Sequence, residues 1–319
     1  MGWCTTHDLD RFLTEAGGYL SSRAAENMLL LAAAQSVGDA HHDARPAGAD
    51  AGQPDDGEAE ATGPGPLFGW WEPPDGGGTR GAFLHDPAEP LLIAGRAPET
   101  AASLAAALAR AGRSVCGVDA SAEAADAFAA AWSQRAGVAT RVHRHTLVYR
   151  LAQVPAAPET GPGPTGRLRT ATEVDRPLLV AWLTAFSAEV GQLTGVPEAS
   201  ADELLGYGGA VFWEAGGQPV AMAAVTRPVM RTVRITMMYT PPEHRHNGYA
   251  VAVTLAVSHA ELARRASEVV LITDSNRPHR QAAQLGYELI GERAVLRFGP
   301  ATGSIPRLPT GPLPRLRSR

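Results

Sequence analysis

The stretch 232–265 constrains the fold more than any other part of the sequence. Residues 232–240 are a run of apolar and β-branched side chains that predicts a strand. Pro241 and Pro242 follow, and they cannot continue a ladder of backbone hydrogen bonds. The pattern over 248–265 then predicts a long helix. A strand therefore passes into a helix through a short loop, as in mixed α/β folds.

The loop between this strand and helix has the residues of a phosphate-binding turn. The first turn of a helix has amide groups without intrahelical partners and carries about half a positive charge, so a diphosphate finds donors there. Gly248 and Ala250 are small enough for the backbone to approach such a ligand, and Arg245 can add a charged contact. The alternative is an ordinary strand-to-helix turn with Arg245 exposed.

This loop resembles that of the GCN5-related N-acetyltransferases (GNAT), whose Arg/Gln-x-x-Gly-x-Gly/Ala pattern it matches at Arg245, Gly248 and Ala250. Downstream, Val270–Asp274 and Leu285–Tyr287 look like the family's next strand and the end of its next helix. The resemblance implies that the diphosphate belongs to acetyl-CoA or another acyl-CoA. It also implies which residues contact this co-substrate: Met237, Met238, Tyr239, Thr240, Arg245, His246, Asn247, Gly248, Tyr249, Ala250 and Asn276.

The second half of the chain has the order of elements that the resemblance implies. Its patterns predict strands at 167–171, 210–215, 220–226, 232–240, 269–273 and 293–298, and helices at 176–189, 248–265 and 278–285. Strands from hairpins alternate here with helices that have an apolar face. The second half is therefore expected to be a mixed sheet flanked by helices.

The first half looks like a second unit of the same kind that has lost the phosphate loop. Its patterns predict strands at 67–72, 81–85, 91–94, 115–118 and 142–151, helices at 100–111 and 122–135, and one or two helices within 3–37. After the third strand the sequence is Gly95-Arg-Ala-Pro-Glu-Thr, and Glu99 would compete with phosphate for the same amides. The expected fold class is therefore α/β (α+β), with two tandem GNAT-like units of which the first is degenerate.

Composition predicts the boundaries between these parts. Residues 38–66 have almost no large apolar side chain, so we expect a disordered insertion within a first domain of residues 1–154. Residues 155–166 are rich in Pro and Gly and predict a linker to the acetyltransferase domain, 167–298. The proline-rich residues 299–319 predict a flexible tail. We expect the acceptor to bind in a cleft between the two halves.

Acyl transfer to an amine needs an unprotonated nucleophile, stabilisation of an oxyanion and a proton for the leaving thiolate. By the resemblance, main-chain groups of Met237–Tyr239 hold the thioester carbonyl, and each backbone donor in a dry site contributes about 3 kcal/mol. The strand has no carboxylate to act as general base. Glu189 is the first choice, because its helix walls the acceptor site in the family. Glu214, His244 and a chain of water molecules are the alternatives.

The proton donor for the leaving group is where the chain departs from the family pattern. Members commonly have a Tyr four residues before the Gly that ends the penultimate helix, and this position is Ala282 here. Ser275 and His279 are the remaining candidates, whereas Tyr287 is expected to pack under the sheet. A thiol has a pKa near 8.5, so loss of the acid costs about a hundredfold in rate rather than all activity.

Composition excludes several classes of protein. All 28 basic residues are Arg, which excludes lysine-dependent P-loop, pyridoxal and lysine-nucleophile chemistry. A net charge of −5 argues against a nucleic-acid partner. There is no apolar run of about 18 residues and no basic leader, so we expect neither a membrane partner nor export, and a cytoplasmic location. Two cysteines and no cluster of metal-ligand residues predict neither a disulfide framework nor a metal.

Three functions remain at this stage. The first is an acyl-CoA-dependent N-acyltransferase that moves acetyl from acetyl-CoA to a primary amine of a small molecule, by direct attack in a ternary complex. The second is a non-catalytic acyl-CoA-binding or scaffold protein that has lost its general acid. The third is a transferase that uses another acyl thioester, for which the small side chains of Ala282 and Ala283 leave room.

Overall fold

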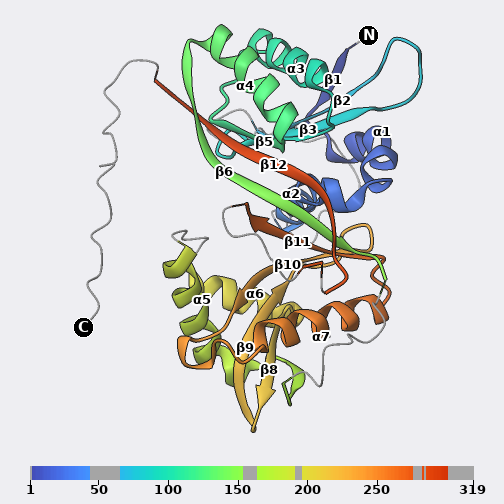
Figure 1. The fold of residues 1–319 in the computed structure, drawn as a ribbon. Coiled ribbons are helices and arrows are strands. Elements are labelled where there is room, and N and C mark those ends of the chain that lie inside the picture. Colours follow the sequence, from blue (N-terminus) through green and yellow to red (C-terminus); the bar gives the residue numbers. More distant parts are fainter. Residues whose placement is uncertain are drawn as a thin grey trace.

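The computed structural model describes residues 2–43, 65–153, 164–190, 196–275, 282–283 and 285–300. In this part of the chain twelve strands form one continuous sheet, with helices on both of its faces (Figure 1). The predicted fold class, a mixed α/β arrangement with helices flanking a mixed sheet, is confirmed. The two sheets expected for the two halves are joined edge to edge.

The first half begins with a strand, two helices and a meander. Its elements are β1 (Trp3–Thr6), α1 (Leu9–Ser21), α2 (Ala24–Asp43), β2 (Leu67–Trp71), β3 (Gly81–His85), β4 (Leu91–Ala94), α3 (Pro98–Arg110), β5 (Gly117–Ser121), α4 (Ala122–Ala136) and β6 (Val138–Leu151). Strands β1 to β4 pair antiparallel in chain order. Strand β5 pairs parallel with β4 after the crossover helix α3. The predicted hairpin β2–β3 and the strand β4 are confirmed.

The second half repeats this plan. Its elements are β7 (Arg167–Thr170), α5 (Arg176–Val190), α6 (Pro197–Tyr207), β8 (Ala210–Ala215), β9 (Gln218–Val225), β10 (Thr232–Tyr239), α7 (Tyr249–Ala263), β11 (Glu268–Asp274) and β12 (Glu288–Pro300). Strands β7 to β10 pair antiparallel in chain order. Strand β11 pairs parallel with β10 after the crossover helix α7. The predicted strand-to-helix passage from β10 to α7 is thus confirmed.

The two halves exchange their last strands. The sheet order is β1-β2-β3-β4-β5-β12-β6-β11-β10-β9-β8-β7. Strand β6 ends the first half in sequence but pairs with β11 of the second, whereas β12 ends the second half and pairs with β5 of the first. The two exchanged strands also pair with each other and run across the middle of the molecule (Figure 1). The division at residues 154 and 167 stays a prediction, and each of its units contributes a strand to the other's sheet.

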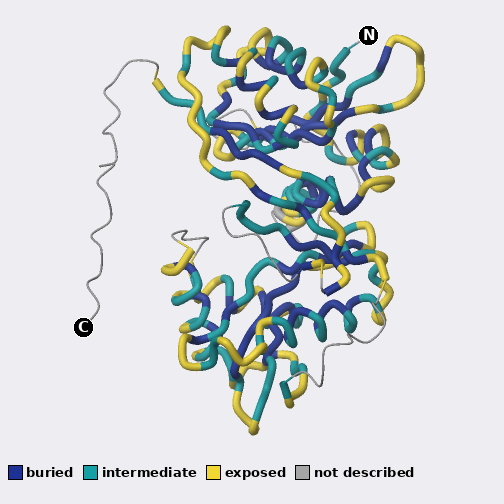
Figure 2. The backbone as a smooth tube through the Cα atoms, in the orientation of Figure 1, coloured by how far each residue is buried: buried dark blue, intermediate teal, exposed yellow. Residues whose placement is uncertain are grey.

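Helices cover both faces of the sheet in each half. Neighbouring strand residues point to opposite faces, so Phe83 packs against α3 and α4 while Leu84 packs against α1 and α2. In the second half α7 covers one face, and α5 with α6 covers the other. Figure 2 shows the buried residues concentrated along the strands, between these helix layers.

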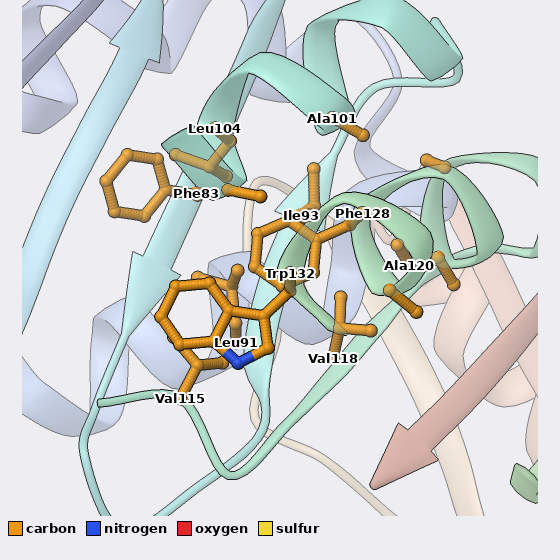
Figure 3. Packing of buried hydrophobic residues seen from close by; sticks show 14 of the residues in the cluster. Phe83, Leu91, Ile93, Ala101, Leu104, Val115, Val118, Ala120, Phe128 and Trp132 are labelled. Atoms are coloured by element: carbon orange, nitrogen blue, oxygen red, sulfur yellow. The ribbon is translucent and has the colours of Figure 1, made fainter. Parts of the chain in front are cut away.

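The core of the first half explains how alanine-rich segments form stable helices. Alanine has the highest helix propensity, and its small side chain lets a helix approach a sheet closely. Ala101 and Leu104 of α3 are buried in this way, in one core cluster with Phe83 of β3 and Phe128 of α4 (Figure 3). The ring of Phe128 is in turn stacked on Trp132, with 6.0 Å between the ring centroids.

Several sequence-based boundaries are wrong. Residues 3–6 are a strand rather than part of a helix, because Trp3 pairs with Trp71 and its indole donates to the hydroxyl of Ser103. Helix α2 continues to Asp43, so the expected disordered insertion cannot start at residue 38, and most of its span lies outside the described residues. Helix α6 was not predicted. It begins at Pro197, in the first turn where proline is favoured, and ends at Tyr207, followed by Gly208 with φ 72° as its C-cap.

The closing strands also differ from their expected lengths. Strand β6 begins at Val138 and β12 at Glu288, each earlier than its apolar pattern indicates. The added residues 138–141 pair with 297–300, and the added residues 288–292 pair with 147–150. Both added stretches are largely exposed, so they carry no alternating pattern. Strand β5 lies at 117–121 instead of 115–118, because Val115 packs in the core from the preceding turn. The helix expected at 278–285 falls mostly outside the described residues.

Candidate active site

Strand β10 leads from the middle of the sheet into the predicted loop. Its register against β9 shifts between Ile235 and Met237, so a bulge separates two regular stretches. After the bulge, Met237 packs with α5 and α6, whereas Met238 packs toward α7 and its sulfur accepts a hydrogen bond from the Thr254 hydroxyl at 3.0 Å. Tyr239 is buried beside Trp182 at 5.9 Å between ring centroids. The bulge therefore directs Met237 toward the face of the sheet that α5 and α6 cover.

Strands β10 and β11 separate beyond the bulge. Their parallel pairing runs from Thr232 with Glu268 to Ile235 with Leu271 and then stops. Strand β11 continues to Asp274 on β6 instead, while β10 stays paired with β9 to Tyr239. A gap in the sheet's hydrogen bonding therefore opens between 236–239 and 272–274. Backbone groups of β10 that face this gap have no ladder partner in β11.

The loop after β10 is held by its own side chains. The Arg245 Nε donates to the Thr240 carbonyl at 3.0 Å. The Asn247 side-chain amide donates to the carbonyls of His244 and Arg245, both at 3.2 Å. His246 has φ 65°, a left-handed conformation that turns the chain sharply. Hydrogen bonds to loop carbonyls leave the amide groups of the helix start available for a ligand.

Helix α7 begins without a capping side chain. Its N-cap is Gly248 with φ 78°, and the first helical hydrogen bond runs from the Ala252 amide to the Gly248 carbonyl at 3.0 Å. No side chain in the described part of the chain accepts from the amides of the first turn. Tyr249 packs on the core, and the Ala250 carbonyl accepts from the Thr254 hydroxyl. This helix start has the donors and the dipole that bind an anion.

Arg245, which was predicted to contact the phosphate, and Glu189, the predicted general base, contact each other. The Arg245 Nη2 lies 2.5 Å from the Glu189 Oε1, and both side chains are partly exposed. The hydrogen bond to Glu189 raises the pKa of the Arg245 guanidinium. Glu189 lies at the end of α5 and is absent from the described lining of the cavity below. An anion at the helix start would compete with Glu189 for Arg245.

A cavity of about 800 Å³ lies between the two halves of the molecule. The first half lines it from α2, β5 and β6, and the second half from α5, α6, β10, β11 and β12. Thr236 and Met237 from β10 and Ile272 and Asp274 from β11 lie at its wall, on both sides of the gap between these strands. The cavity therefore meets the gap between β10 and β11.

Sequence reasoning missed several polar groups of this cavity. Glu203 and Tyr207 come from α6, which the sequence pattern did not reveal, and Arg234 comes from β10. The Tyr207 hydroxyl donates to the Val225 carbonyl at 2.7 Å, and burial raises the pKa of this phenol to about 12. Arg234 interrupts an otherwise apolar strand, which was a visible signal in the sequence.

The residues considered as proton donors for the leaving group have different surroundings. The Ser275 amide donates to the His145 carbonyl at 2.9 Å. His279 and Asn276 lie outside the described residues. Ala282 is fully buried, and the buried hydroxyl of Tyr287 lies 2.7 Å from the Ser258 hydroxyl, as its predicted packing required. Burial strongly raises the pKa of the Tyr287 phenol.

Two other predicted groups lie away from the cavity lining in the described part of the chain. Glu214 forms an ion pair with Arg167 at 2.7 Å. The ring of His244 packs edge-on against Tyr249, with 6.4 Å between centroids. No cluster of three His, Cys, Asp or Glu side chains suited to a metal occurs among the described residues. None of the helices described has the length and apolar character that crossing a membrane requires.

Comparison with known proteins identifies the fold. No protein-family model and no curated protein matches the sequence. A GCN5-related N-acetyltransferase from Sphaerobacter thermophilus is similar over 78% of this chain and 84% of its own, at 18% identity and a TM-score of 0.51. A Drosophila protein is similar over 94% of this chain and 99% of its own, at 14% identity and a TM-score of 0.56. At such identities the likeness shows the fold alone.

Proposed function

We propose that this chain, which has the fold of the GCN5-related N-acetyltransferases, is an acyl-CoA-dependent N-acyltransferase that acetylates a primary amine of a small molecule. The observation that carries the proposal is the gap between β10 and β11 beside the uncapped start of α7. A site for a diphosphate and a site for an extended thioester arm thus adjoin each other. The gap opens toward the cavity between the halves.

The residues at the helix start fit a diphosphate. Amides of the first turn of α7 supply donors, Gly248 has no side chain to obstruct the ligand, and Arg245 is within reach of the same loop. The four residues Met237–Thr240 would line the arm of the coenzyme, with His246, Asn247 and Asn276 as its further predicted contacts. Acyl-CoA brings the thioester that serves as the acyl source.

The chain's own groups would act on the acceptor and the oxyanion. Amides of β10 that face the gap are positioned to donate to a carbonyl oxygen as negative charge develops on it. The acceptor nitrogen forms the new amide bond in a ternary complex, loses a proton, and the sulfur leaves as a thiol. Glu189 remains the proposed base, and Ser275 or His279 the proposed proton donor.

One observation favours a non-catalytic acyl-CoA-binding protein as the second candidate. Ala282 is buried at the position where the family commonly has its proton-donating Tyr, so no phenol is available there. The same small side chain is compatible with a longer acyl thioester as the donor. These alternatives differ in turnover and in the preferred thioester.

A binding titration and a turnover screen test the proposal together. Calorimetry with CoA should give saturable binding that Arg245→Glu abolishes, because the new carboxylate repels the diphosphate and Glu189. Arg110→Glu, on the exposed end of α3, is the matched charge control. Thiol release from acetyl-CoA over a panel of amines should reveal an acceptor. Binding without release from any thioester would favour the non-catalytic candidate, and no binding would refute both.

A further inference from the structure

Arg234 is the cation on β10 that faces the cavity between the two halves. Its neighbours Val233 and Ile235 are buried in the core under α7, so the Arg234 side chain leaves the opposite face of the sheet. Its backbone is fixed, because its amide donates to the Thr226 hydroxyl at 3.1 Å and its carbonyl accepts from the Thr226 amide at 2.9 Å. The strand therefore holds this guanidinium at the cavity wall.

The Arg234 guanidinium forms no hydrogen bond and no ion pair with any residue that the structure describes. The carboxylate that acts on it favourably is Asp119, and the nearby cation Arg144 acts against it. Asp119 is already engaged, since the Arg293 Nη2 lies 2.7 Å from its Oδ1 and both side chains are almost buried. Burial lowers the pKa of Arg234 below its usual range, as expected for a cation without a close counter-charge.

Other arginines of the same sheet show what a structural arginine looks like in this protein. Arg293 pairs with Asp119, Arg150 with Glu268 and Glu288, and Arg169 with Asp175. Each of these guanidinium groups donates to a carboxylate at 3.2 Å or less. Arg234 differs from them: it is only partly buried, it lines the cavity, and no carboxylate among the described residues pairs with its guanidinium. Arg234 is thus better explained by a ligand than by packing.

We propose that Arg234 binds a carboxylate group of the acceptor, so that the substrate is a small amine that carries an acid group. The proposal deepens the proposed function and rests on it for the identity of the cavity as an acceptor site. A carboxylate would supply the counter-charge that Arg234 lacks, through a bidentate contact of the kind arginine favours. Glu203 lines the same cavity and suits the positive charge of the amine before its deprotonation.

Kinetics with matched acceptors test this assignment. ω-Amino acids are compared with the alkylamines that lack the carboxylate. The acids have three to six carbons, because Arg234 and Met237 are three residues apart, roughly 10 Å along a strand. The wild type should prefer the acids. Arg234→Met should remove that preference by raising their KM about ten- to a hundredfold, with kcat, the alkylamine rates and CoA affinity little changed. Arg110→Gln, on the exposed end of α3, is the control and should keep the preference.

Thermal unfolding separates a ligand-binding role from a structural one. Arg234→Met should leave the melting temperature unchanged or higher, since no carboxylate loses its partner. Arg293→Met should lower it, because Asp119 is left buried and unpaired. An Arg234→Met protein that melts as low as Arg293→Met and keeps the acid preference would overturn the proposal. A wild type that prefers the plain alkylamines would overturn it too.

A direct ligand probe keeps the proposal testable if no acceptor is turned over. Glutarate should raise the melting temperature of the wild type and of Arg110→Gln, but not that of Arg234→Met. Failure of CoA binding or thiol release with a retained glutarate response would refute the proposed function while supporting the carboxylate site. An equal glutarate response in the wild type and Arg234→Met would refute the site itself.

Discussion

Replacing Gly248 by Val perturbs the two properties of the α7 start that the proposed donor site needs. The residue has φ 78°, which costs an L-amino acid roughly 1–2 kcal/mol, and the cost is greater for a β-branched side chain. The only described atoms within 4 Å of an added Cβ are Pro164 Cδ at 3.6 Å and Cγ at 3.7 Å, which is ordinary contact. The free energy of unfolding should therefore fall by about 1–2 kcal/mol from backbone strain rather than from a clash.

The affinity for CoA should fall further than this strain explains. A side chain at Gly248 would stand where the diphosphate must approach the first-turn amides. Loss of one charged hydrogen bond corresponds to about tenfold or more in the CoA Kd, measured by calorimetric titration. Gly217→Val is the matched control, since Gly217 has φ 77° and open space around its Cβ, in the turn between β8 and β9. If both variants bind CoA equally well, this loop does not hold the diphosphate.

Three further predictions concern charged and buried groups. Glu189→Gln should free Arg245 and tighten CoA binding by up to about fivefold in calorimetry at low salt, with the gain vanishing at high salt; a fall in kcat at saturating CoA would support Glu189 as the base. Contacts with Arg169 lower the pKa of Asp175 to about 2, so its contribution of about 1 kcal/mol is present above pH 4 and is lost as the pH falls toward 2. In denaturant titrations the wild type's advantage over Asp175→Asn should shrink over that range, and a constant difference would contradict the assignment. Tyr287→Phe should cost about 1 kcal/mol of stability by removing a buried hydrogen bond yet leave kcat within twofold, whereas a large loss of kcat would make this phenol the proton donor.

Local patterns predicted the part of the fold that depends on local chemistry. The apolar run of β10, its two terminal prolines and the helical pattern after Gly248 specify a strand, a loop and a helix without any tertiary information. The predicted alternation of strand faces also separates Met237 from Met238, although the bulge decides which one faces the cavity. Short-range signals of this kind also predicted the hairpins β2–β3 and β8–β9.

The parts that failed depend on partners far away in sequence. Strand β1 forms because β2 offers an edge more than 60 residues later, and four residues carry too little pattern to show it. The exchange of β6 and β12 leaves no local trace, since either strand suits either sheet. The pairing of Glu189 with Arg245 and the lack of a partner for Arg234 likewise depend on tertiary placement. The residue types alone indicate which side chains are charged, but not whether each charged side chain has a partner of opposite charge.

Because β6 and β12 each pair with a strand of the other half, neither half can be replaced without affecting the other. A recombination event between residues 154 and 167 would bring in a second half whose β12 does not match β5 of the first half. Strand β6 would likewise have to pair with a β11 of different sequence. The first half cannot then be discarded as a spare copy, because its strand β6 completes the sheet of the half that has the loop. During synthesis, moreover, the edge of β5 stays open until β12 has left the ribosome, so a neighbouring nascent chain could donate its own β12 in the meantime.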